Sequence, residues 1–219
     1  MSLYLVGASN PETRRQILAH EDARALVGLG PEVKGFIDND PAKKAFIGYP
    51  VLGGFEVVPG LVVNDREARF VNLITRTMKI RWEVSVALVE MGCKWGNLIH
   101  PSVDLTDVQV GHGLYIQDGV TVQARTRLGD EVVIHTGAIV CHECLVGTGA
   151  FLAPGVVLCG RVVVGTAAFV GANATVIPDV TIGRWATVGA GTVVIEDVEP
   201  YTTVVGNPAH VVPSSKVAL

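Results

Sequence analysis

Aliphatic side chains recur at every sixth position through the second half of the chain. The series has no gap and consists of Val110, Ile116, Val122, Leu128, Ile134, Val140, Val146, Leu152, Leu158, Val164, Val170, Val176, Ile182, Val188 and Val194. A helix cannot keep a strict six-residue period, because its own period is about 3.6 residues. The pattern instead predicts a parallel β-solenoid of triangular cross-section, with roughly six residues on each side and eighteen in each coil. Successive coils would pair like neighbouring strands, about 4.8 Å apart.

A second inward position lies two residues before each member of this series and mostly carries small side chains. From residue 132 onward its occupants are Val132, Ala138, Cys144, Ala150, Val156, Val162, Ala168, Ala174, Val180, Ala186 and Thr192. Glycines at the predicted turns are expected to permit tight corners. They are Gly111, Gly129, Gly147, Gly165, Gly183 and Gly189. Such a coil exposes flat apolar faces that it cannot bury alone, so we expect self-association.

The first 95 residues follow a different pattern, in which short apolar runs alternate with longer mixed segments. The apolar runs predict strands at 3–8, 33–40 and 70–75, and the longer segments predict helices at 9–28 and 81–92. Ser9 or Asn10 is the expected cap of the first helix, because short polar side chains accept hydrogen bonds from its first backbone amides. We therefore expect a small α/β domain at 1–95 and the solenoid, with a C-terminal tail, at 96–219.

Composition narrows the possible partners and compartments. The 219 residues carry a net charge of −4, which argues against nucleic acid as the main partner. The first residues include no basic region and no long apolar run, so we expect no signal peptide. The sequence has no run of ~20 apolar residues, so we also expect no membrane span. Four cysteines are too few for a disulfide scaffold in a chain of this length. The cytoplasm is the expected compartment.

One polar cluster, Val-Cys-His-Glu-Cys-Leu at 140–145, interrupts the aliphatic pattern and raises two hypotheses. Adjacent cysteine and histidine residues could form a metal site, but Cys144 falls on an inward position while Cys141 and His142 fall at a corner. Their ligand atoms would diverge, whereas a closed zinc site needs four that converge. We therefore expect no metal here. The other hypothesis is that His142 is a general base.

Counting in steps of eighteen places the neighbours of this cluster. Cys141 stacks on Cys159, and Glu143 lies between Arg125 and Arg161. Glu143 could form a surface ion-pair ladder with these arginines, or it could hold the His142 ring in one tautomer. Gly160 lies one coil beyond His142, where we expect open space and an unused backbone N–H beside the imidazole. A base next to such a donor suits acyl transfer, and a solvated corner histidine is the alternative.

These features resemble the hexapeptide-repeat, left-handed β-helix acetyltransferases. The resemblance is strongest to their sugar-modifying branch, the bacterial amino-sugar N-acetyltransferases and sialic-acid O-acetyltransferase-like proteins. It covers nearly the whole chain. The matching segments are VGAS at 6–9, FIDND at 36–40, GYPVLGG at 48–54, LIHPSV at 98–103, HEC at 142–144 and GNPA at 206–209. The resemblance implies an N-terminal Rossmann-like unit followed by a left-handed parallel β-helix.

The resemblance also implies an assembly and a catalytic site. Proteins of this kind are homotrimers with active sites between subunits, acetyl-CoA lies along the solenoid, and the N-terminal domain holds a nucleotide-linked sugar. By this resemblance His142 is the general base and Glu143 its partner. Gly160 would meet the thioester carbonyl oxygen with its amide, and Ala172 and Ala190 would line the arm of the cofactor.

On the acceptor side, the resemblance implies that Asp38 meets the nucleotide base and that the turn containing Ser9 and Asn10 approaches the nucleotide. In this turn, Asn10 and the proline after it replace the glycine and histidine that are common in the branch. His135 stands where an asparagine commonly faces the acceptor, and Phe151 stands where a second histidine is common. The catalytic core therefore matches the branch more closely than the acceptor site does.

The sequence is compatible with four candidate functions to different degrees. The first is acetyl transfer from acetyl-CoA to the amine of a nucleotide-linked deoxyamino sugar, and the second is O-acetylation of sialic acid or a related sugar. A zinc hydratase needs three converging histidines, but His135 and His142 fall on different corners. A non-catalytic solenoid scaffold would lack CoA binding. The sequence favours the first function.

Overall fold

A computed structural model describes residues 1–27 and 32–213. The chain divides into two compact units, Met1–Pro101 and Ser102–Leu219. This division falls a few residues after the predicted boundary at 95. Among the described residues, no helix is both long enough and apolar enough to cross a bilayer.

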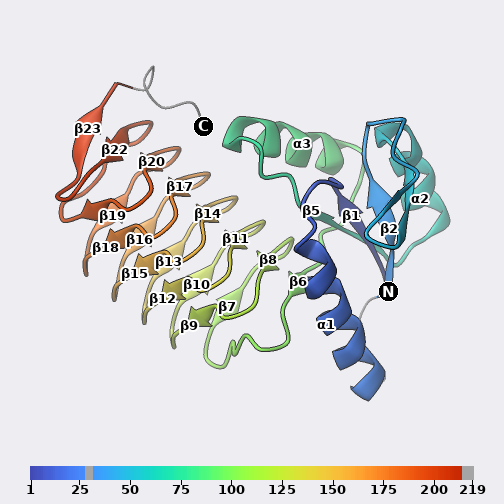
Figure 1. The fold of residues 1–219 in the computed structure, drawn as a ribbon, viewed down its shortest axis with the longest axis horizontal. Coiled ribbons are helices and arrows are strands. Elements are labelled where there is room, and N and C mark those ends of the chain that lie inside the picture. The colour runs from blue at the N-terminus through green and yellow to red at the C-terminus, as the bar shows by residue number, and fades with distance from the viewer. Residues whose placement is uncertain (28–31, 214–219) are drawn as a thin grey trace. The chain divides into compact units, whose positions relative to one another are not determined.

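Unit 1 is a sheet with helices. The strands lie in the order β3-β4-β2-β1-β5, and β1 pairs in parallel with both β2 and β5. Figure 1 shows these strands beside the helices α1, α2 and α3. The strand bounds of this sheet are β1 Ser2–Val6, β2 Glu32–Ile37, β3 Ala45–Phe46, β4 Tyr49–Gly53 and β5 Ala68–Asn72, and a further short strand, β6 Leu98–Ile99, lies outside it. The helix bounds are α1 Thr13–Val27, η1 Phe55–Val57, α2 Val58–Asn64 and α3 Met78–Glu90.

The three predicted strands and two predicted helices of unit 1 are present, with shifted ends. The acids predicted to end the second strand lie after it, because β2 stops at Ile37. The hairpin of β3 and β4 and the helix α2 were not predicted. Their local signals are weak: β3 has only two residues, and α2 contains Pro59 and Gly60, which are poor helix formers.

A compact apolar core holds this sheet together. Its buried members come from the strands and from α2, α3 and the following turn. They are Tyr4, Val6, Ile37, Val58, Ala68, Phe70, Leu88 and Cys93. Tyr4 and Phe70 stack with ring centroids 5.4 Å apart, so two adjacent strands contribute one continuous aromatic surface.

Unit 2 is a β-helix of three sides, each a stack of short parallel strands, with β23 added antiparallel to β22 at one end (Figure 1). The β7 side contains β7 Gln109–Val110, β10 Arg127–Leu128, β13 Leu145–Val146, β16 Val163–Val164 and β19 Thr181–Ile182. The β8 side contains β8 Tyr115–Ile116, β11 Val133–Ile134, β14 Phe151–Leu152, β17 Phe169–Val170, β20 Thr187–Val188, β22 Thr203–Val205 and β23 His210–Val212. The β9 side contains β9 Thr121–Val122, β12 Ile139–Val140, β15 Val157–Leu158, β18 Thr175–Val176 and β21 Val193–Val194.

The six-residue prediction is confirmed in register as well as in period. Strands pair with partners eighteen residues away, as in Val140 with Leu158, so each coil covers eighteen residues. The hexad residue is the second of each two-residue strand, and from Ile116 onward it is buried. Val110, in the first coil, remains 42% exposed. The small inward positions are also buried, and the architecture fits a left-handed β-helix of hexapeptide repeats.

The corner glycines have a different role from the predicted one. Gly111, Gly129 and Gly147 do not adopt positive φ, so they are not needed for the corner conformation. A Cβ on each of the three would lie 2.8 Å from a backbone nitrogen of the next coil. These glycines are required because the backbones of successive coils approach too closely for a side chain.

Candidate active site

The polar cluster lies at the corner between the β9 side and the β7 side. Here Glu143 adopts a φ of 61°, and Arg125 and Arg161, eighteen residues away on either side, adopt 63° and 62°. A left-handed residue at this point turns the chain sharply between two strands. The stacked corner conformations therefore place His142, Glu143 and Gly160 in adjacent coils at one edge.

The Glu143 carboxylate lies against the His142 ring. The Glu143 Oε2 atom lies 3.2 Å from Nδ1 of His142, and its Oε1 atom accepts a hydrogen bond of 3.2 Å from Nη1 of Arg125. A carboxylate can only accept, so this contact requires the proton on Nδ1 and leaves the lone pair of Nε2 available. The side chain of His142 is half exposed.

The predicted ladder of two arginines around Glu143 is only half formed. Arg161 instead makes a bidentate ion pair with Asp179, with distances of 2.6 and 2.7 Å. The hydrogen bond from Arg161 holds the pKa of the Asp179 carboxyl below its usual value. Glu143 therefore contacts one arginine and one histidine: Arg125 binds its Oε1 atom, and His142 contacts its Oε2 atom.

Gly160 lies directly against the His142 ring, which corrects the expectation of open space. A Cβ at Gly160 would be 2.6 Å from Cε1 and 2.7 Å from Nε2 of His142. The ring can occupy its place because position 160 has no side chain. The geometry also brings Nε2, the unprotonated nitrogen, to the glycine backbone.

Within the described part of the chain, the amide of Gly160 makes no hydrogen bond. One coil earlier, the amide of His142 donates to the side chain of Gln123 at 3.1 Å. Cys141 replaces that glutamine in the next coil, and within residues 1–27 and 32–213 the N–H of Gly160 has no acceptor. Gly160 is buried, and a buried amide without a partner is costly unless a ligand uses it.

The cysteines of the cluster diverge. Cys144 is fully buried in the solenoid core and its Sγ contacts the carbonyl oxygen of Cys159 at 3.1 Å. Burial raises the pKa of the Cys144 thiol to about 11 and also raises that of Cys141. All four cysteines are free thiols. In the described part of the chain, no three metal-ligating side chains come together.

The other predicted residues of unit 2 lie at the corner between the β8 and β9 sides, or beside it. His135 contacts Phe151, with ring centroids 4.8 Å apart, and Phe151 stacks on Phe169 at 5.4 Å. Ala172 and Ala190 follow β17 and β20 at this corner, one coil apart. None of these shares the corner of His142, so unit 2 by itself does not gather all the predicted residues at one point.

Unit 1 contains a cavity of about 310 Å³ at the carboxyl ends of its parallel strands. Such a position is typical of nucleotide sites in open α/β sheets. Its lining residues are Val6, Gly7, Ser9, Ile37, Asp38, Asn39, Phe55, Ile74, Thr75, Arg76, Ile80 and Val84. Ser9 and Asp38 were predicted and line the cavity; Asn10 is not among the lining residues. The loop after β5, with Thr75 and Arg76, was missed, although it follows a parallel strand as the other loops do.

Asp38 is engaged by its own unit. Its Oδ2 atom accepts hydrogen bonds of 2.9 Å from both the amide of Ala8 and Nζ of Lys43, and Oδ1 accepts one from the amide of Asp40. Burial opposes ionisation of Asp38, but these donors outweigh it and hold the pKa of the carboxyl below its usual value. Asp38 therefore ties the loop after β1 to the loop after β2.

Comparison with known proteins places this chain in a family. Residues 161–196 match the model of the bacterial transferase hexapeptide (six repeats). The structure matches a variant of GDP-perosamine N-acetyltransferase from Caulobacter crescentus, solved with CoA and GDP-perosamine, with 30% identity, a TM-score of 0.85 and 98% of each chain covered. The chain belongs to the hexapeptide-repeat sugar N-acetyltransferases. The resemblance seen in the sequence is thereby confirmed.

A second solved structure is similar over nearly the same length. The acetyltransferase domain of PglB from Neisseria gonorrhoeae, solved with acetyl coenzyme A, shares 29% identity at a TM-score of 0.82, covering 96% of this chain and 98% of that one. No curated protein sequence matched the chain. The predictions of an acyltransferase and of acetyl-CoA as its co-substrate are both supported by these relatives.

Proposed function

We propose that this protein transfers the acetyl group of acetyl-CoA to the amine of a nucleotide-linked deoxyamino sugar. The observation that carries this proposal is that Gly160, whose amide has no acceptor among the described residues, lies against the Cε1–Nε2 edge of the His142 ring. It is supported by the relative from Caulobacter crescentus, which was solved with CoA and GDP-perosamine. Crystals of that relative carry alanine or asparagine in place of one histidine, which marks a histidine as a residue of interest there.

The proposed mechanism is direct attack. The amine nitrogen of the sugar attacks the thioester carbonyl carbon and gives a proton to Nε2 of His142. The carbonyl oxygen becomes an oxyanion and accepts a hydrogen bond from the amide of Gly160. The tetrahedral intermediate then collapses: the carbon–sulfur bond breaks, and the CoA thiolate leaves with the proton held by His142. Glu143 stabilises the imidazolium between these steps.

The two units divide the ligands in this proposal. Unit 1 acts as a Rossmann-like nucleotide domain, because its cavity lies at the carboxyl ends of parallel strands. Unit 2 binds acetyl-CoA, and the backbone at Ala172 and Ala190 lines the arm of the cofactor. His135 and Phe151 contact the acceptor sugar. Four free thiols fit a reducing compartment, and we place the enzyme in the cytoplasm.

We expect a homotrimer in which another copy covers the His142 corner. Two large apolar side chains flank that corner, Ile139 at 37% and Leu145 at 42% exposure. A shallow groove of about 500 Å³ also runs along the β7 side. Sedimentation equilibrium should give three times the mass of one chain. A stable monomer at micromolar concentration would contradict this prediction, and Leu145→Glu should shift the protein toward monomer.

The proposed reaction is tested with purified protein, acetyl-CoA and a panel of nucleotide-linked amino sugars. Thiol release and mass spectrometry should show one acetyl group added per thiol formed. The product should resist mild alkali, because an amide survives where an ester is cleaved. An alkali-labile product would indicate O-acetylation instead, and CoA binding without transfer to any sugar would favour a scaffold.

A further inference from the structure

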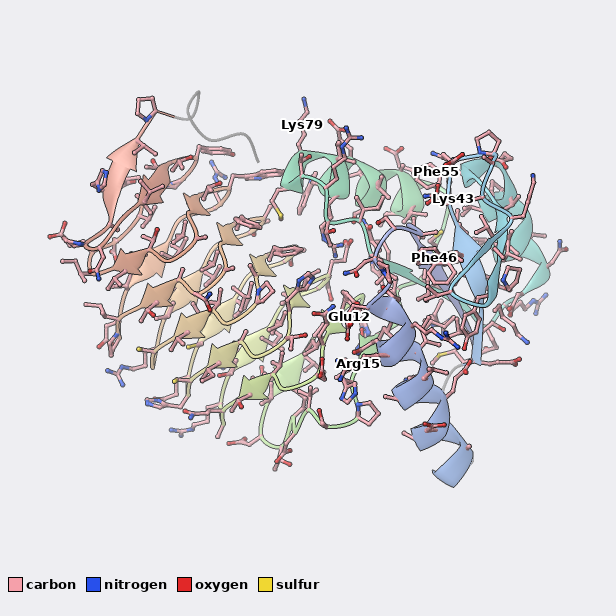
Figure 2. The ribbon with its side chains drawn as sticks, in the orientation of Figure 1. Glu12, Arg15, Lys43, Phe46, Phe55 and Lys79 are labelled. Carbon is pink, nitrogen blue, oxygen red and sulfur yellow. The ribbon has the colours of Figure 1, made fainter. Side chains whose placement is uncertain are left out.

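The first turn of α1 offers little to a phosphate group. Pro11 has no N–H, and the amides of Glu12 and Thr13 already donate to Oδ1 and the backbone oxygen of Asn10, at 3.0 and 3.2 Å. Glu12 also places a carboxylate here, paired with Arg15 at 3.0 Å (Figure 2). Helix N-termini bind anions through unpaired amides, but the amides at this N-terminus already donate hydrogen bonds to Asn10.

The loop after β5, which lines the cavity, differs from the first turn of α1 in charge and in its available amides. Arg76 lines the cavity from this loop, is exposed, and forms no ion pair with any described residue. The α3 helix begins two residues later, and Ile80 and Val84 on its first two turns line the same cavity. Among the described residues, the amides of Met78 and Lys79 have no acceptor.

The charges of the cavity point to the same loop. Arg76 is the one cationic residue among the described residues that line it, and Asp38 is the one anionic residue. The nearby ammonium of Lys43 is paired with Asp38 at 2.9 Å and also donates to the carbonyl oxygen of Ala8. Lys43 is thus neutralised by its own loop, which leaves the guanidinium of Arg76 for a ligand.

The loop that carries Arg76 is held in place from both ends. The buried guanidinium of Arg81 donates to the carbonyl oxygens of Asn72 and Ile74 at 2.6 and 3.2 Å. The side chain of Asn72 accepts from the amide of Ile74 at 3.0 Å, and the hydroxyl of Thr77 accepts from the amide of Ile80 at 3.1 Å. A ligand would therefore meet a loop whose backbone is already ordered.

We propose that the diphosphate of the nucleotide-linked substrate binds to Arg76 and to the N-terminus of α3, rather than to the first turn of α1. This rests on the proposed function and assigns Arg76 as a binding residue for that substrate. A guanidinium can contact a phosphate through two parallel hydrogen bonds, and the positive end of α3 adds to its attraction. From the loop after β1, Ser9 contacts the same diphosphate through its backbone amide and its hydroxyl.

Isothermal titration with nucleosides and with their diphosphates tests this assignment. The probes are UDP, GDP and dTDP, each compared with uridine, guanosine or thymidine. Arg76→Ala should lower the affinity for the diphosphate that the wild-type protein binds best by about 10- to 100-fold, which is the loss expected for hydrogen bonds to a charged group. Affinity for the matching nucleoside should stay the same. Arg76→Lys should recover part of the loss, since it restores charge but not the paired contacts.

Arg66→Ala is the matched control, because Arg66 is an exposed arginine of the same unit that lies outside this cavity. It should leave diphosphate binding unchanged, and the KM for acetyl-CoA should be unchanged in every variant. Unaltered diphosphate affinity in Arg76→Ala would overturn the assignment alone, as would an equal loss for nucleoside and diphosphate. Failure of the wild-type protein to bind any of the diphosphates would overturn both the assignment and the nucleotide part of the proposed function.

Discussion

Replacing His142 by alanine should lower the turnover number by about 10²–10⁴-fold, the usual contribution of a positioned general base. The reason is the state of the imidazole: Glu143 accepts from Nδ1 at 3.2 Å, so Nε2 is the atom that can take a proton from the acceptor amine. The side chain is half exposed, and its removal should change the free energy of unfolding little. Steady-state kinetics with saturating acetyl-CoA measures this loss.

A measurement of CoA affinity shows whether His142→Ala has removed only the general base or has disrupted the whole site. It should be nearly unchanged in His142→Ala, because the proposed contacts of the cofactor arm lie at Ala172 and Ala190. Glu143→Gln is the companion variant: it should cost less than His142→Ala, because it removes a positioning group rather than the base. Turnover within about threefold of wild type in His142→Ala would remove His142 from the chemistry.

The second large effect is expected at Gly160. Even alanine would put a Cβ 2.6 Å from Cε1 of His142, so the ring must move out of its place. An imidazole shifted by about 1 Å should cost on the order of 10²-fold in turnover. Gly160→Val should abolish transfer, since its larger side chain also blocks the approach of the thioester to the amide. Turnover should be measured beside a thermal melt of each variant.

Gly137→Ala provides the control for this experiment. Gly137 also lies at a corner of unit 2, and a Cβ there would meet nothing within 4 Å. Its φ of 73° makes alanine strained by roughly 1–2 kcal/mol, so this variant loses stability without contacting His142 or Gly160. Wild-type turnover in a folded Gly160→Ala protein would show that the contact between Gly160 and His142 does not matter for catalysis.

Much of the solenoid could be predicted because its rule is local and repeated. Each side of a coil needs one buried aliphatic residue, so the series from Val110 to Val194 carries the fold in a form that the sequence displays directly. Counting by eighteen then brought His142 beside Gly160 and Glu143 beside Arg125, and the structure contains both contacts. The period of a repeat is enough to place stacked neighbours.

Side-chain partners within that register could not be predicted. Arg161 was expected on Glu143 but forms an ion pair with Asp179, because each corner side chain can reach two coils and the better geometry decides. The glycine of the His142 corner was expected to leave space, yet the ring fills that space. Both outcomes depend on how individual side chains orient at the corner, which the period of a repeat does not encode.

In unit 1 the sequence determined the alternation of strands and helices, and only the tertiary structure decided what the loops between them do. Parallel strands gather the loops after β1, β2 and β5 at one edge, and there Asp38 accepts hydrogen bonds from Ala8 and Lys43. Arg76 had no sequence signal of its own, because an exposed arginine in a loop looks like any other. Its position became meaningful only when the fold placed it on the wall of a cavity and paired the nearby Lys43 with Asp38. Periodicity is a property of neighbours along the chain, whereas a binding site is a property of loops brought together from distant segments.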